Sequence, residues 1–190
     1  MGANVAALAG LRVRDARVID ALAVARVELE TIRVAYHGAV PDERLTTLTC
    51  EELAERWGRI IAVLPERGGC FYVVEDGDGQ VVAFAAGRAN PTDEEPGRGE
   101  LGVIVVLPTY HRQGVGRRLV GLVARHLAGR GLRSMIVRTL RDTAQSRRFY
   151  EALGGTLVEE RRAEFYGVPV DEVTYHWADV HALVPLAEDA

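Results

Sequence analysis

The chain has 190 residues, of which 48% are hydrophobic and 26% are charged, and its formal net charge at pH 7 is −4. These values are typical of one globular domain, and a negative chain lacks the basic surface expected of a nucleic-acid-binding protein. No apolar run approaches the roughly 20 residues of a membrane span, and the N-terminus lacks the pattern of a secretory signal. We therefore expect a cytoplasmic protein with neither nucleic acid nor membrane as a partner.

Two kinds of chemistry are also disfavoured by the composition. All 23 basic residues are arginine, so no lysine can form a Schiff base. Cys50 and Cys70 lack the spacing of metal ligands, and the five histidines form no cluster in the sequence. The sequence therefore predicts no metal site.

The front half of the chain predicts two helices followed by two strands. Apolar residues at helical spacing predict a helix over 17–36, and a capping box of Thr49 and Glu52 predicts another through Ile61. Apolar runs over 70–75 and 80–86 predict strands, which the turn-forming residues 76–79 would join as a hairpin. Pro, Gly and acidic residues over 90–99 predict a surface loop.

The back half alternates strands and helices. It predicts a strand over 100–107, a helix over 114–128, a strand around 135–137 and a helix over 144–153. Two further strands, over 156–162 and 170–177, would be joined by a turn at 167–169. This order predicts a mixed α/β, or α+β, domain that spans residues 1–190.

The stretch from Val103 to Val120 carries the strongest functional pattern. An apolar run ends at Pro108, a polar turn follows, and Gly114 and Gly116 open a segment of helical period. The first N–H groups of a helix lack partners and carry partial positive charge, and glycine lets an anion approach them. The pattern predicts a phosphate or pyrophosphate cradle, although a helix can also begin near a glycine without binding a ligand.

A second motif covers Arg147 to Gly155 and reads Arg-Arg-Phe-Tyr-Glu-Ala-Leu-Gly-Gly. Alone, it predicts an amphipathic helix with Phe149 and Leu153 in the core and a glycine cap. Because it follows a strand, a Gly-x-Gly helix and a second strand, the region 100–177 resembles the GNAT N-acetyltransferase superfamily. The front half is similar more loosely, through Tyr36-His-Gly followed by Pro41 and Leu45.

The resemblance implies the GNAT acyl-CoA N-acyltransferase fold, with helices on both faces of a mostly antiparallel sheet of about six or seven strands. One parallel strand pair would splay apart after Val105. The acetyl-CoA-binding core would span about 100–155, and helices on the acceptor side about 15–62. Acetyl-CoA is the implied co-substrate, and no metal is implied.

The resemblance also implies which residues hold acetyl-CoA. The pantetheine arm would pair like an added strand with the backbone of Val103, Ile104, Val105 and Val106. The pyrophosphate would lie against His111, Arg112, Gln113, Gly114, Val115, Gly116 and Arg117. The second helix would add Thr143, Ser146 and Phe149. His111 departs from the usual Gln or Arg, which would make its phosphate contact pH-dependent, and Thr143 or Ser146 stands in for the usual Asn.

Two residues are predicted to be catalytic. Tyr150 would lie near the thioester sulfur and donate a hydrogen bond or proton to the departing thiolate, unless it is a packing residue with a wet tip. Glu100 would accept the proton of the amine through water, unless it is a solvated charge at a strand end. Glu28, Glu30 and His37 lie near the implied acceptor pocket and receive no catalytic role.

The leading interpretation is an enzyme that moves the acetyl group of acetyl-CoA to a primary amine by direct attack in a ternary complex. The acceptor would be a small-molecule or peptide amine, in a pocket shaped by residues 27–48 and 164–170. The alternatives are a non-catalytic CoA-binding or regulatory module, and a transferase that acts on a protein N-terminus or a charged tRNA. The net charge counts against the tRNA. The exposed edge of the 156–177 hairpin is suited to a homodimer.

Overall fold

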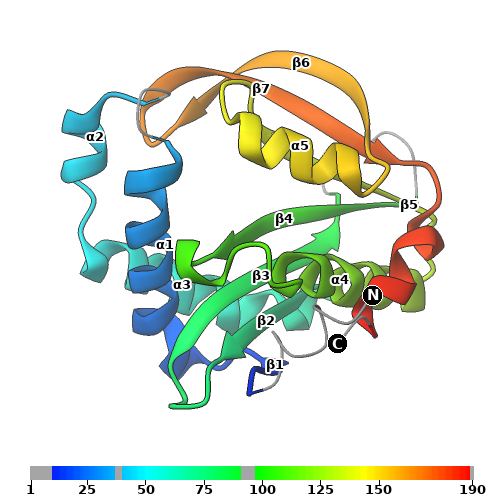
Figure 1. Cartoon of the computed structure of the whole chain (residues 1–190), viewed down its shortest axis with the longest axis horizontal. Coiled ribbons are helices and arrows are strands. Elements are labelled where there is room, and N and C mark those ends of the chain that lie inside the picture. The colour runs from blue at the N-terminus through cyan, green and yellow to red at the C-terminus, as the bar shows by residue number, and fades with distance from the viewer. Residues whose placement is uncertain (1–9, 37–39, 91–96, 189–190) are drawn as a thin grey trace.

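The computed structural model describes residues 10–36, 40–90 and 97–188. These residues form a seven-stranded sheet with the order β1-β2-β3-β4-β5-β7-β6 (Figure 1). Every neighbouring pair is antiparallel except β4 and β5, which confirms the predicted mixed sheet with one parallel pair. The strands are β1 (Arg12–Asp15), β2 (Cys70–Glu75), β3 (Val81–Ala89), β4 (Arg98–Val106), β5 (Ser134–Leu140), β6 (Thr156–Phe165) and β7 (Val168–Trp177).

Helices cover both faces of the sheet, as the resemblance implies. On one face, α1 (Ala21–Ala35) and α3 (Cys50–Val63) share a core with Phe71 and Phe84. On the other face, α4 (Val115–Gly129) and α5 (Ala144–Ala152) share a core with Val74 and Leu101, and α5 lies alongside β7 (Figure 1). Shorter helices complete the chain: η1 (Val18–Asp20), α2 (Asp42–Thr46), η2 (Pro65–Arg67), η3 (Pro108–Tyr110) and η4 (Val180–Ala187).

The predicted elements are present, with shifted bounds and several additions. The capping box of Thr49 and Glu52 is formed at the start of α3, and Gly114 is the N-cap of α4 rather than its first residue. The first predicted helix divides into η1 and α1. The sequence analysis missed β1, α2 and η4, which are short or lack a clear period. Most of the predicted loop over 90–99 lies outside the described residues.

The parallel pair separates earlier than expected. β4 and β5 pair only over Arg98–Leu101 and Ser134–Val137, so the predicted separation after Val105 is wrong. The cause is a β-bulge: Ala86 pairs with Val103 but Gly87 pairs with Leu101, which leaves Gly102 as an extra residue. Because a bulge bends its strand, β4 turns away from β5 at this point. Beyond Gly102, β3 is the only strand that pairs with β4 among the described residues.

The described part of the chain contains no helix with the length and apolar character needed to cross a bilayer. It also brings together no group of three His, Cys, Asp or Glu side chains suited to a metal ion.

The contact between α4 and η4 yields a stability prediction. A Cβ atom on Gly121 would lie 2.2 Å from the backbone nitrogen of Ala187, so η4 packs directly against the helix backbone. We expect Gly121→Ala to lower the free energy of unfolding by about 1–3 kcal/mol, because η4 must move away.

Gly129→Ala in the same helix is the matched control, since a Cβ there meets no atom within 4 Å. We expect this change to keep or slightly raise stability, by up to about 1 kcal/mol. Urea denaturation of the two variants measures both effects. Equal effects at the two positions would contradict the close packing of η4.

Candidate active site

The free edge of β4 is the centre of the candidate site. Val103, Ile104, Val105 and Val106 are all only half-buried, although β4 is the middle strand of the sheet. Residues 81–87 of the neighbouring β3 are fully buried. The difference arises because β5 no longer covers β4 beyond Leu101. This edge therefore offers main-chain donors and acceptors, with apolar side chains beside them, to a ligand that can lie along it.

The start of α4 lies beside this edge. Gly114 caps the helix with φ 87°, a left-handed conformation that favours glycine. A Cβ on Gly116 would lie 3.2 Å from the ring of Phe149 and 4.0 Å from Ile104, so the first turn approaches both α5 and β4. The N–H groups of this turn have no acceptor within the helix. They are suited to an anion that lies at the end of the β4 edge.

Two side chains of the loop between β4 and α4, His111 and Gln113, form hydrogen bonds within the protein. The Nε2 atom of His111 donates to the carbonyl of Val106 at 2.8 Å, and its Nδ1 atom accepts from the amide of Gln145 at 3.0 Å. Gln113 donates to the carbonyl of Thr109 at 2.7 Å. His111 therefore joins the end of β4 to the start of α5, and this contact was not anticipated from the sequence.

The three residues predicted to contact the cofactor from the second helix differ in burial and in the atoms that they contact. The hydroxyl of Thr143 is buried and donates to the carbonyl of Leu140 at 2.6 Å, and it also lies 3.1 Å from the hydroxyl of Thr139. Thr143 therefore stabilises the turn before α5. Ser146 is half-buried in the first turn of α5, and Phe149 packs over Gly116.

Tyr150 is buried among aromatic rings. Its ring centroid lies 5.4 Å from that of Phe149, 5.9 Å from Tyr175 and 6.1 Å from Trp177. Burial raises the pKa of its phenol above the ordinary value, and the nearby Tyr36 adds to this effect. Tyr150 thus keeps its proton at neutral pH, as a hydrogen-bond donor must.

Glu100 is buried between two arginines. One carboxylate oxygen lies 2.7 Å from Nη1 of Arg138, and the other lies 3.2 Å from Nη2 of Arg88. It is therefore not the solvated charge that we considered as an alternative. Both oxygens are engaged by guanidinium groups.

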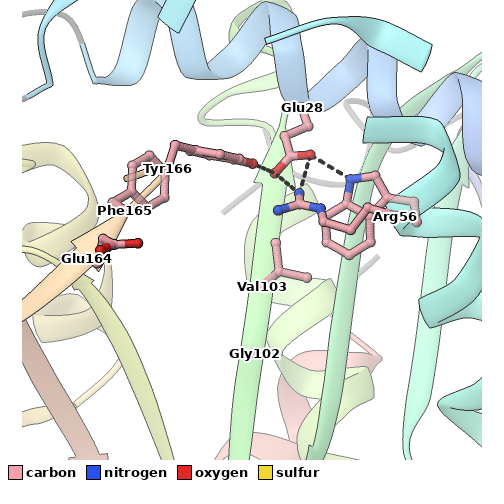
Figure 2. Close-up of a pocket in the computed structure, with 8 residues that line it drawn as sticks. Glu28, Arg56, Gly102, Val103, Glu164, Phe165 and Tyr166 are labelled. Atoms are coloured by element: carbon pink, nitrogen blue, oxygen red, sulfur yellow. Dashed lines mark hydrogen bonds and ion pairs between the residues drawn. The ribbon is translucent and has the colours of Figure 1, made fainter. Parts of the chain in front are cut away.

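A cluster around Glu28 was missed as a unit by the sequence analysis. Glu28 is buried on α1 and accepts hydrogen bonds from Arg56 and Trp57 of α3 and from Tyr166 of the β6–β7 turn (Figure 2). The available signal was that Glu28 interrupts the buried stripe of α1, which includes Val24 and Ile32.

The cluster lines a cavity of about 310 Å³ that reaches the bulge at Gly102 and Val103 (Figure 2). Glu164 and Phe165 complete this wall. Glu28 and residues 164–166 fall in the ranges from which we expected an acceptor pocket, and α3 lies within the expected acceptor-side helices, although Arg56 and Trp57 were not singled out. Glu30 is exposed, and His37 lies outside the described residues.

Tyr36 provides a pH-dependent test of this environment. Burial and the negative charge of Glu28 raise its pKa to about 12, whereas an unfolded tyrosine has a pKa near 10. A raised pKa means that the folded state keeps a proton that the unfolded state loses, so this contribution to stability disappears as the pH rises from about 10 to 12.

We expect the free energy of unfolding to fall between pH 9 and pH 11, and Tyr36→Phe to reduce that fall by about 1 kcal/mol. Urea denaturation at the two pH values gives the difference. The same fall in both proteins would show that the Tyr36 phenol is not desolvated.

Sequence comparisons agree with this geometry. Residues 28–155 match the family model described as the acetyltransferase (GNAT) family. The chain is 31% identical over 175 residues to the uncharacterised N-acetyltransferase YuaI of Bacillus subtilis (strain 168), covering 92% of this chain and 96% of YuaI. It is 32% identical over 136 residues to a mycothiol acetyltransferase of Frankia casuarinae, covering 68% of this chain but 35% of that protein.

Solved structures show the same fold. The PaiA N-acetyltransferase of Thermoplasma acidophilum, in complex with coenzyme A, has a TM-score of 0.70 at 15% identity, over 86% of this chain and 97% of its own. A phosphinothricin acetyltransferase of Sinorhizobium meliloti, in complex with acetyl-CoA, has a TM-score of 0.67 at 20% identity, over 90% of this chain and 89% of its own. The family match over residues 28–155 and the near full-length similarity to YuaI together show that the chain belongs to the acetyltransferase (GNAT) family.

Proposed function

We propose that this chain transfers the acetyl group of acetyl-CoA to a primary amine by direct attack, with both substrates bound. The observation that carries the proposal is the free edge of β4, where Val103–Val106 lie half-exposed in the middle of the sheet. The first turn of α4 approaches both Ile104 of this edge and Phe149 of α5, and Phe149 packs against the ring of Tyr150. Family membership supports the same reaction.

The residues present fit the cofactor. A pantetheine arm carries amide groups, which can pair with the main chain of Val103–Val106 as a strand would. A pyrophosphate fits the first turn of α4, where Gly114 and Gly116 keep side chains away from the backbone. Arg112 and Arg117 add positive charge near that turn, and guanidinium groups suit phosphate oxygens.

Acetyl-CoA supplies the acetyl group as an activated thioester. In our proposal the hydroxyl of Tyr150 donates its proton to the departing sulfur, since a phenol that stays neutral can both orient and protonate a thiolate. Glu100 is our candidate acceptor of the amine proton through water, held by Arg88 and Arg138.

The remaining parts of the proposal concern the acceptor and the assembly. The acceptor is a small-molecule or peptide amine that enters the cavity beside Gly102. The whole chain acts as one domain, and its location is cytoplasmic, where acetyl-CoA and the free thiols of Cys50 and Cys70 would persist. A homodimer would form at β6, which ends the sheet and exposes Leu157 and Val158.

The alternatives have less support. A non-catalytic CoA-binding module would not require a phenol in α5 whose pKa is raised by burial, so that it stays protonated. A transferase for charged tRNA would be expected to be basic, whereas the net charge is −4.

The catalytic test is Tyr150→Phe. We expect it to lower kcat for amine acetylation by about 100-fold or more, because the departing sulfur loses its proton donor. The Kd for acetyl-CoA, measured by titration calorimetry, should stay within about twofold, since the ring keeps its packing. An unchanged kcat would remove Tyr150 from the mechanism.

The binding test is Gly114→Glu. A carboxylate at this turn should abolish acetyl-CoA binding through bulk and charge, whereas Gly114→Ala is the control for the strain of a side chain at φ 87°. We expect calorimetry to detect binding by Gly114→Ala and none by Gly114→Glu. Absence of binding by the folded wild-type protein would overturn the proposed function.

A further inference from the structure

The hydrogen-bonding capacity of Glu28 is already used. Its two oxygens accept four hydrogen bonds: two from Nη2 of Arg56 at 2.7 Å, one from Nε1 of Trp57 at 2.5 Å and one from the hydroxyl of Tyr166 at 2.9 Å. An ionised carboxylate offers about four acceptor positions. Glu28 therefore has no free position for the ammonium group of a substrate, and its effect is to hold Arg56 in place.

Arg56 keeps donors that this cluster does not use. Both of its hydrogen bonds to Glu28 start from Nη2, and within the described part of the chain its Nε is buried without a hydrogen-bond partner. Figure 2 shows the other terminal nitrogen pointing away from Glu28, into the space beside Val103 and Tyr166. Arginine has donors but no acceptor, so this nitrogen can bind only an acceptor atom of a ligand.

The guanidinium group is also fixed in orientation. Its central carbon lies 4.6 Å from the ring centroid of Trp57 and 5.4 Å from that of Tyr166. Stacking on two aromatic rings and bonding to Glu28 remove most of the rotational freedom of the side chain before any ligand arrives. An arginine fixed in this way is suited to bind a carboxylate strongly and in one direction.

We propose that Arg56 binds a carboxylate of the acceptor, so that the preferred substrate is a small amino acid rather than a simple amine or a peptide N-terminus. The inference rests on the proposed function, because it concerns the acceptor of that reaction. A cavity of about 310 Å³ is at the small end of ligand pockets, which suits a free amino acid. In a peptide, the α-carboxylate of the first residue is replaced by an amide.

Glu164 provides the contrasting hypothesis. It lines the same cavity and is exposed, so a pocket selective for a second cationic group would depend on this carboxylate. Carboxylate recognition by Arg56 does not require it. The two hypotheses therefore differ in which side chain sets the choice of acceptor. Removing the charge of Arg56 should change that choice under the first hypothesis, and removing the charge of Glu164 should change it under the second.

The experiment measures kcat/KM for acetylation of matched acceptors. Each α-amino acid and ω-amino acid in a panel is paired with its own amide, which keeps the amine and removes the negative charge. Release of the coenzyme A thiol reports the rate. We expect the best acid to exceed its amide by about tenfold or more, since hydrogen bonds to charged groups have that effect on binding.

Two variants test whether Arg56 causes the preference. The double variant Glu28→Gln/Arg56→Met removes both charges, so no unpaired charge stays buried, and we expect the ratio of acid to amide to fall to about one. Glu28→Gln alone keeps Arg56 and should retain the preference, as should Glu164→Gln. Urea denaturation confirms that each variant is folded.

The outcomes separate this inference from the proposed function. Suppose that the wild-type protein binds acetyl-CoA but acetylates acids and amides equally, amides only, or neither. Each of these results overturns the role of Arg56 but leaves acetyl-CoA binding intact. A preference for acids that survives in the folded double variant, or that is lost in Glu164→Gln, also overturns it. Absence of acetyl-CoA binding by the wild-type protein overturns both.

Discussion

The whole candidate site depends on the bulge at Gly102, where β4 stops pairing with β5. A middle strand of a sheet normally has both edges bonded, because an unpaired backbone group inside a protein is unfavourable. Here the parallel pair ends at Leu101 and Val137, and after the bulge at Gly102 the four residues Val103–Val106 pair with β3 and, within the described residues, with no other strand. The bulge thus leaves a polar edge between apolar side chains at the centre of the molecule. A ligand with amide groups of its own can complete that edge.

In our proposal, the two sides of the candidate site bind different substrates. On the α4 side, a glycine N-cap, the first helical turn and Phe149 form a surface for a long, phosphorylated cofactor. On the α1 and α3 side, Glu28, Arg56, Trp57 and Tyr166 surround a small cavity that reaches the same bulge. Val103 lines this cavity and also belongs to the free edge of β4, so we expect the reacting groups to meet near it. His111 links the end of β4 to the start of α5, the helix that carries Tyr150.

Sequence reasoning predicted what local patterns encode. Gly114 and the Phe149-Tyr150 pair stand in segments whose period and glycines define a turn and a helix, and the structure has both elements close to the predicted positions. The bulge was not predicted, because Gly102 lies in an apolar run whose partner strand is set by tertiary pairing. The cluster around Glu28 was not predicted either, because its members come from α1, α3 and the β6–β7 turn, and no local spacing relates them.

Backbone hydrogen exchange tests the central claim most directly. The amides of Val103–Val106 should exchange readily where they face the open edge in the free protein, and saturating acetyl-CoA should slow their exchange. Residues 81–87 of β3, which are buried within the sheet, provide the internal reference. Protection confined to residues 103–106 and the start of α4 would agree with strand-like pairing of the cofactor. Tight binding of acetyl-CoA with unchanged exchange over 103–106 would contradict it.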